Sequence, residues 1–130
     1  MILALDSSIL IELQNGNKDV IKKIQELKEV HQSISYIPFI VYFEVYGGIL
    51  KKLERNQQEA YKFLQLFPLL QPTKKTAEIL AELKKKYDEL GEALPLADLM
   101  IASQVKEHNL LLVTKDTDFN KIQEIKKIIY

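Results

Sequence analysis

The sequence contains no cysteine and only one arginine, and both shortages exclude certain kinds of site. Without cysteine there is no disulfide framework, no thiolate metal site and no cysteine nucleophile. Of the 18 basic side chains only Arg55 is an arginine, so any phosphate clamp must rest mainly on lysine or on backbone N–H groups. The absence of disulfides suits a reducing cytoplasm, which is the compartment that we expect.

Long apolar runs and an excess of charge of one sign are also missing. No apolar run is long enough to cross a membrane, and the N-terminal MILALDSS lacks the basic region and cleavage site of a signal peptide. The formal net charge is +0, so the chain as a whole is not built to bind a polyanion. Because 47% of the residues are hydrophobic and 28% are charged, one globular domain over residues 1–130 is predicted.

The spacing of apolar residues predicts strands that alternate with helices. Strands are expected at 2–5, 33–37, 110–113 and 127–130. Helices are expected at 7–13, 18–30, 38–53, 56–67, 73–90, 96–108 and 119–125, the first of them capped by Ser7 or Ser8. Because strands separated by helices pair in parallel through right-handed crossovers, we predict an α/β fold with a parallel sheet of about four to five strands covered on both faces.

Three acidic residues follow two of the predicted strands. Asp6 comes directly after the first strand, and Asp116 and Asp118 follow the strand at 110–113 within the stretch VTKDTDF. In parallel sheets, binding sites collect outside the carboxyl ends of the strands. Each acid also has a structural explanation, since Asp and Ser commonly form turns and cap helices. The function of these acids depends on whether others arrive at the same place.

Glu44 is the only charge in the segment YIPFIVYFEVYGGIL, residues 36–50. On a helix, none of its neighbours at i±3 and i±4 offers a salt bridge, and two of them are Gly47 and Gly48. A buried carboxylate without a partner costs several kcal/mol or becomes protonated. We therefore expect a partner or a cation beside Glu44, and the two glycines indicate that something packs closely against this helix.

Asp98 repeats this pattern in LPLADLMIASQV, which carries no other charge. It shares one helical stripe with Ile101, Ala102 and Val105. The helix dipole favours an acid in the first turn by about 0.3–1 kcal/mol, which explains an exposed Asp98 but not one on the core-facing stripe. Acids that converge without basic partners need a cation to stay ionised, and oxygen-only ligands favour Mg²⁺ or Mn²⁺ over zinc.

Four blocks in order along the chain, LDSSILIE, FEVYGGI, LADLMIAS and LLLVTKDTDF, resemble PIN-domain ribonucleases. The closest likeness is to the VapC-type toxins of prokaryotic toxin–antitoxin pairs. The resemblance implies a PIN-like three-layer α/β/α fold and a Mg²⁺- or Mn²⁺-dependent endoribonuclease that cleaves single-stranded or loop RNA. It also implies a homodimer and a small antitoxin protein as partner.

Carried over block by block, the resemblance implies an acidic quartet of catalytic residues: Asp6, Glu44, Asp98 and Asp116. Asp6, Asp98 and Asp116 are predicted to bind the metal, with Glu44 bound directly or through water. Asp118 has an auxiliary role in this scheme.

Two supporting residues and one substrate contact complete the predicted site. Ser8 is expected to orient Asp6, and Thr114 to support the pocket through hydrogen bonds. The family often has threonine at position 7, where Ser7 keeps the hydroxyl. Arginine is often frequent near the site of such toxins and is nearly absent here, so Lys115 is the candidate for contacting RNA phosphate.

Other functions remain open at this stage. A phospho-receiver or a haloacid-dehalogenase-like phosphatase requires a different arrangement of acids, since Ser8 stands where such a phosphatase has its second aspartate. A PIN-like module that binds RNA or protein without cutting is the alternative. The aromatic residues Tyr42, Phe43 and Tyr46 are either buried under neighbouring helices or exposed for a dimer and an antitoxin peptide.

Overall fold

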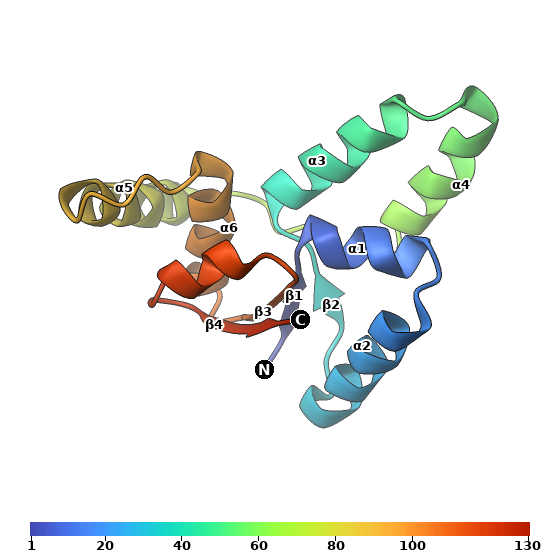
Figure 1. The fold of residues 1–130 in the computed structure, drawn as a ribbon, viewed down its shortest axis with the longest axis horizontal. Helices are drawn as coiled ribbons and strands as arrows, with labels where there is room; N and C mark the ends of the chain where they lie inside the picture. Colours follow the sequence, from blue (N-terminus) through green and yellow to red (C-terminus); the bar gives the residue numbers. More distant parts are fainter.

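The computed structural model describes all residues, 1–130, and contains one parallel sheet with six α-helices (Figure 1). The strands are β1 (Leu3–Leu5), β2 (Ser35–Tyr36), β3 (Leu111–Thr114) and β4 (Lys126–Ile129), in the order β2-β1-β3-β4. The helices are α1 (Ser7–Gln14), α2 (Lys18–His31), α3 (Phe39–Leu50), α4 (Glu54–Leu64), α5 (Lys74–Glu89) and α6 (Leu96–Glu107). The predicted three-layer α/β/α architecture with a parallel sheet is confirmed, with four strands.

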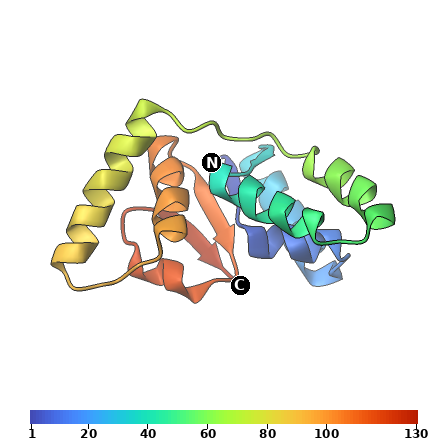
Figure 2. The same ribbon diagram turned by 90° about the horizontal axis from the view of Figure 1, so that it is seen from above.

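The strand order explains why helices cover both faces of the sheet. The chain moves from β1 to β2 through α1 and α2, and then back past β1 to β3 through α3 to α6. Connections between parallel strands are right-handed as a rule, and these two run in opposite directions across the sheet, so their helices lie on opposite faces. The long connection from α4 to α5 spans the molecule, and α5 packs against α6 at the far end (Figures 1 and 2).

The two central strands form the middle of the core. Every residue of β1 and β3 is buried, as expected for parallel strands covered on both faces. Helix α6 is also buried along most of its length, from Leu99 to Val105. A single hydrophobic cluster of 28 buried residues joins these elements to the inner faces of the other helices. None of the helices combines the length and the apolarity needed to cross a membrane.

Several local predictions were wrong in detail. Asp6, not Ser7 or Ser8, caps α1, because its carboxylate accepts the first free backbone N–H. The helix predicted at 119–125 is a 3₁₀ turn, η1 (Thr117–Lys121), which Asp116 caps in the same way. The predicted strand at 33–37 shortens to two residues, β2, plus a bridge between Ile37 and Leu69.

Candidate acidic site

The site lies where the carboxyl ends of β1 and β3 meet. These two strands are neighbours, and the chain leaves them in opposite directions, toward β2 after β1 and toward β4 after β3. Such a point leaves a crevice at the edge of the sheet that neither connection covers. Asp6 begins one connection and Asp116 lies at the start of the other. The fold thus brings together acids that are more than a hundred residues apart in sequence.

Asp6 is nearly buried, with 5% of its surface exposed, and its carboxylate accepts several hydrogen bonds. The backbone N–H of Ser7 donates to Oδ1 at 2.8 Å. The hydroxyls of Ser8 and Thr114 donate to Oδ2 at 3.2 and 2.6 Å. The Ser7 hydroxyl lies 3.4 Å from Oδ1. These donors fix the orientation of the carboxylate at the end of β1.

Thr114 connects the two strand ends directly. Its side chain is fully buried and donates to Asp6, while its Oγ1 accepts the backbone N–H of Asp116 at 3.0 Å. Ser8 makes the second link, because its Oγ accepts the backbone N–H of Lys115 at 3.1 Å. The two residues therefore have the contacts expected of supporting residues, and each joins α1 to the segment after β3.

Asp98, Asp116 and Asp118 form the tightest carboxylate group. One oxygen from each lies within 4.8 Å of the others, a separation that one metal ion can bridge. The Oδ1 of Asp116 accepts the backbone N–H of Asp118 at 2.9 Å, which fixes the Asp116 carboxylate next to the backbone of Asp118. Asp118 was predicted to be auxiliary, but the geometry places it in this group and leaves Asp6 outside the 4.8 Å limit.

The five acids influence one another electrostatically. Partial burial raises the pKa of Asp98 to about 6, helped by the negative charges of Asp116, Asp6, Asp118 and Glu44. Desolvation, and then the charge of Asp6, also raises the pKa of Glu44. Both carboxyl groups therefore hold their protons to a higher pH than an isolated acid does. A cation nearby would favour the ionised form of both groups and lower both pKa values.

Residues 3–125 match the PIN domain family, which is nearly the whole chain. The chain belongs to the PIN domain family. Ribonuclease VapC2 of Rickettsia felis is 31% identical over 98% of this chain and 92% of its own length.

Solved structures agree with this family. VapBC2 of Rickettsia felis, crystallised with a DNA fragment from its promoter, has a TM-score of 0.88 at 22% identity, covering 100% of this chain and 99% of that one. A toxin–antitoxin complex from Klebsiella pneumoniae has a TM-score of 0.72 at 25% identity, covering 95% and 94%. The predicted resemblance to PIN-domain proteins of the VapC type is confirmed.

Glu44 was expected to be buried, because its sequence neighbours are apolar, but it is not. Its side chain is exposed, because α3 buries only the stripe formed by Val41, Val45 and Ile49. The two glycines were expected to let something pack closely against this helix, but a Cβ added at either position meets no atom of this chain within 4 Å. Glu44 nevertheless faces the acids closely enough for Asp6 to shift its pKa. It stands at the rim of the site.

Lys115 is exposed, and its ammonium group pairs with Glu12 of α1, at 3.3 Å. In this arrangement its side chain contacts none of the site acids. The hydrogen bond from the Lys115 backbone to Ser8 is its link to the site. The one cation within ion-pair distance of the carboxylate group is Lys121, 3.8 Å from the half-exposed Asp118.

Gln104 is a positioning residue that sequence reasoning missed. It is buried in α6, where its Oε1 accepts the backbone N–H of Phe39 at 2.8 Å and its Nε2 donates to the carbonyl of Leu70 at 2.9 Å. These bonds tie α6, which carries Asp98, to the first residue of α3, which carries Glu44. The available signal was an amide in the middle of the apolar segment after Asp98.

The donor set of the PIN site fits a hard divalent cation. It offers carboxylate oxygens alone, and the chain has no cysteine to add a thiolate. Neither histidine contributes, since His31 contacts the N-terminus and His108 lies beside Glu107. Burial, and then the negative charges of the other acids, raise the pKa of Asp98, so its ionised form is disfavoured without a counterion. A divalent cation would neutralise that repulsion.

Proposed function

We propose that this chain is a Mg²⁺- or Mn²⁺-dependent endoribonuclease and the toxin of a VapBC-type toxin–antitoxin pair. The observation that carries the proposal is the carboxylate group Asp98, Asp116 and Asp118, set beside Asp6 at the strand ends of a PIN fold. The 31% identical relative is a ribonuclease, and the structural relatives include toxin–antitoxin complexes. A site of oxygen ligands that meets substrate phosphate is typical of Mg²⁺ enzymes.

Each residue has a defined part in this proposal. Asp98, Asp116 and Asp118 would hold the ion, with Asp6 reaching it directly or through water. When bound, the ion supplies a water of lowered pKa and neutralises charge that develops on the phosphate oxygens. Glu44 orients the attacking water and accepts its proton, for which a raised pKa is suited. Hydrolysis then leaves a 5′-phosphate and a 3′-hydroxyl.

The supporting hydroxyls keep the carboxylates in place. Ser8 and Thr114 hold Asp6 in one orientation, and Thr114 also fixes the backbone that presents Asp116. Precise placement of charged groups before the reaction is the main source of rate enhancement at such sites. Loss of one carboxylate should therefore reduce the rate far more than it reduces stability.

The first experiment compares Asp6→Asn with Asp19→Asn. Asp19 is an exposed acid at the start of α2 and lies outside the site, so it controls for loss of one negative charge. We expect Asp6→Asn to abolish RNA cleavage in the presence of Mn²⁺, while Asp19→Asn cleaves normally and both remain folded. Undiminished cleavage by Asp6→Asn would contradict the assignment.

Metal binding can be measured without any reaction. Calorimetric titration with Mn²⁺ should show binding to the wild type and at least about tenfold weaker binding to Asp98→Asn, because one ligand is lost. A protein that binds Mn²⁺ and RNA but never cuts would instead be the non-catalytic PIN-like module. Sequencing the RNA ends that accumulate when the chain is expressed alone would identify the substrate.

We further propose two protein partners, a second copy of the chain and a small antitoxin. An antitoxin that places an arginine or lysine among the five acids would neutralise them in place of the metal. The lack of a basic side chain at the centre of the group leaves that position available. The reading frame next to the gene is where the antitoxin is expected.

A further inference from the structure

Two adjoining cavities form a groove that begins at the acidic site and ends at basic residues. The first, about 240 Å³, lies between α1 and α3 and is lined by Glu44, Gly48 and Lys52 among others. The second, about 340 Å³, continues past the end of α3 and is lined by Arg55 and Asn56 among others. Gln14 and Lys52 line both cavities. We refer to the two together as the α1–α3 groove.

Buried side chains of α3 form the floor of the α1–α3 groove, and the space above Gly48 is empty. Val45 and Ile49 are 8% and 3% exposed and form a rigid base near the acidic end. Gly48 lies between them along α3, and a Cβ there would meet nothing within 4 Å. The surface over Gly48 is therefore open to a chain that crosses α3 at this position.

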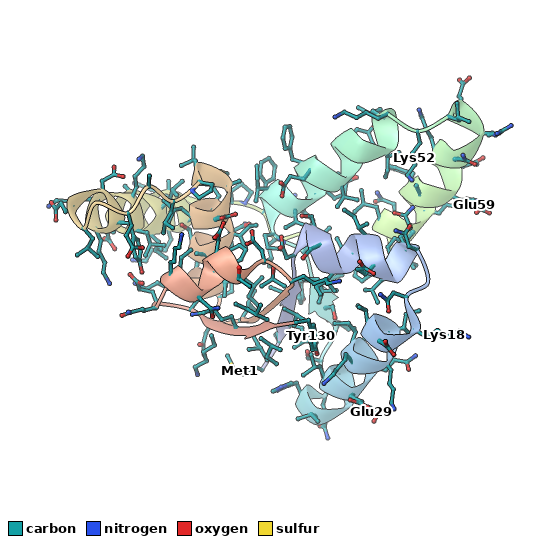
Figure 3. All side chains as sticks on the ribbon, viewed as in Figure 1. Met1, Lys18, Glu29, Lys52, Glu59 and Tyr130 are labelled. Atoms are coloured by element: carbon teal, nitrogen blue, oxygen red, sulfur yellow. The ribbon has the colours of Figure 1, made fainter.

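The far end of the groove carries two basic side chains that form no ion pair. Lys52 and Arg55 are exposed, and neither has a carboxylate oxygen within 4.0 Å. Lys84, Lys85 and Lys86 of α5, by contrast, all pair with acids. Figure 3 labels Lys52 where α3 ends and Glu59 on α4. Glu59 lines the same cavity as Arg55 but lies beyond ion-pair distance of it.

The lining of this end favours a polyanion over a peptide helix. Besides Ala60 and Phe63, the second cavity is lined only by charged and amide side chains. A helical peptide would need an apolar row along the whole groove, whereas a nucleic acid backbone needs cations and hydrogen-bond donors. Phe63 is the one aromatic ring in either cavity, and an aromatic face can stack on a base.

We propose that the α1–α3 groove is a subsite for single-stranded RNA on one side of the cleaved bond, with Lys52 and Arg55 each contacting a phosphate. The proposal rests on the proposed ribonuclease function and names where the substrate lies. It also explains how a chain with zero net charge and an acidic site retains a polyanion. The basic end anchors the RNA, and the acidic end holds the phosphate that is cut.

The test measures binding apart from cleavage. A fluorescent single-stranded oligoribonucleotide of mixed sequence is titrated with protein in chelator, and fluorescence anisotropy is read at several salt concentrations. Lys52→Ala/Arg55→Ala should weaken RNA binding roughly tenfold at low salt. Its slope of log affinity against log salt should be shallower by about 1.4, because two phosphate contacts are lost.

Two further variants sharpen the result. Lys51→Ala removes an adjacent exposed lysine that lines neither cavity and should leave the affinity and salt slope unchanged. Glu59→Gln removes a negative charge from the groove and should tighten RNA binding. In cleavage assays with Mn²⁺, the double variant should raise KM and keep kcat, because it loses binding outside the reacting centre.

The outcomes separate the two proposals. If the wild type cuts no RNA, the ribonuclease function is wrong whatever the groove binds. If the wild type cuts RNA but the double variant binds it like Lys51→Ala, the groove assignment is wrong. If the double variant keeps its RNA affinity and instead loses affinity for the antitoxin, the groove holds a protein, which likewise overturns our assignment.

Discussion

At the scale of single residues, Asp98 carries a conflict that the fold does not resolve by itself. It is partly buried in the first turn of α6, and the charges of four other acids surround it. No hydrogen bond to its carboxylate offsets this repulsion, in contrast to Asp6 with its serine and threonine donors. A residue placed at such a cost to stability is more easily explained by binding a cation than by folding.

The raised pKa of Asp98 predicts how the stability of the folded protein changes with pH. Because the pKa of Asp98 is raised to about 6, folded protein keeps a proton that unfolded protein has already lost between about pH 4 and pH 6. In chelator, the stability contributed by this group is therefore present at low pH and is lost as the pH rises through about 6. Solvent screening limits the loss to roughly 1–2 kcal/mol.

Urea unfolding at about pH 4 and about pH 7 measures this effect. Asp98→Asn removes the titrating group and should be roughly 1–2 kcal/mol more stable than the wild type at the higher pH. Added Mn²⁺ should make the wild type more stable than Asp98→Asn, because the wild type gains binding energy that the variant lacks. Equal pH dependence in the two proteins would show that Asp98 does not carry this repulsion.

The acids differ in how well the sequence predicted them. Asp6 and Asp116 were predictable because a carboxylate after a buried strand of a parallel sheet lies at the site edge. Asp98 was predictable from an uncharged helical segment. The burial of Glu44 was not, because α3 is apolar all round and only the packing of α1 and α4 decides which face is covered. The position of Asp118 depended on the 3₁₀ turn that Asp116 caps.

At the scale of elements, Gln104 shows how the two halves of the site keep their spacing. Its amide joins the first residue of α3 and the segment before α5 to the middle of α6. The N–H of Phe39 and the carbonyl of Leu70 make no backbone hydrogen bond that could replace the one to Gln104. The spacing between Glu44 and Asp98 therefore depends on one buried side chain that takes no part in the chemistry.

Replacing this amide should be costly. Gln104→Leu leaves the buried carbonyl of Leu70 and the partly buried N–H of Phe39 without their partner and should lower stability by roughly 2–3 kcal/mol. Ser103→Ala is the control, because its hydroxyl bonds only to Leu99 within the same helix. Urea unfolding, with hydrogen exchange at the Phe39 amide, distinguishes the two. A Gln104→Leu protein as stable as Ser103→Ala would rule out this positioning role.

The existence and order of the elements followed from periodicity, whereas their ends often depended on contacts distant in sequence. Helices α2, α5 and α6 match their predicted ranges to within a residue or so. Asn17 and Thr73 cap α2 and α5, and Pro95 directly precedes the apolar segment that forms α6. Strand β2 is shorter than predicted, since its length is set by pairing with β1 and by the bridge at Ile37. No local pattern encodes such a limit.

At the scale of the whole molecule, α3 exposes an apolar stripe that the monomer does not cover. Phe39, Phe43, Tyr46 and Leu50 follow one another at helical spacing and are 39%, 65%, 38% and 58% exposed. The sequence left open whether Tyr42, Phe43 and Tyr46 are buried. Phe43 and Tyr46 are exposed, whereas Tyr42 is partly buried against the core. A stripe of this kind can pair with its own copy across a twofold axis.

We therefore expect the chain to be a dimer at micromolar concentration, held in part by Phe43. Size-exclusion chromatography with light scattering should give twice the chain mass of 15.1 kDa for the wild type and a shift to monomer for Phe43→Asp, because a charge in an apolar interface stays unpaired. Leu66→Asp places the same charge on a residue that is 73% exposed and lines a different cavity, and it should stay dimeric. A monomeric wild type, or dissociation by both variants, would contradict pairing through α3.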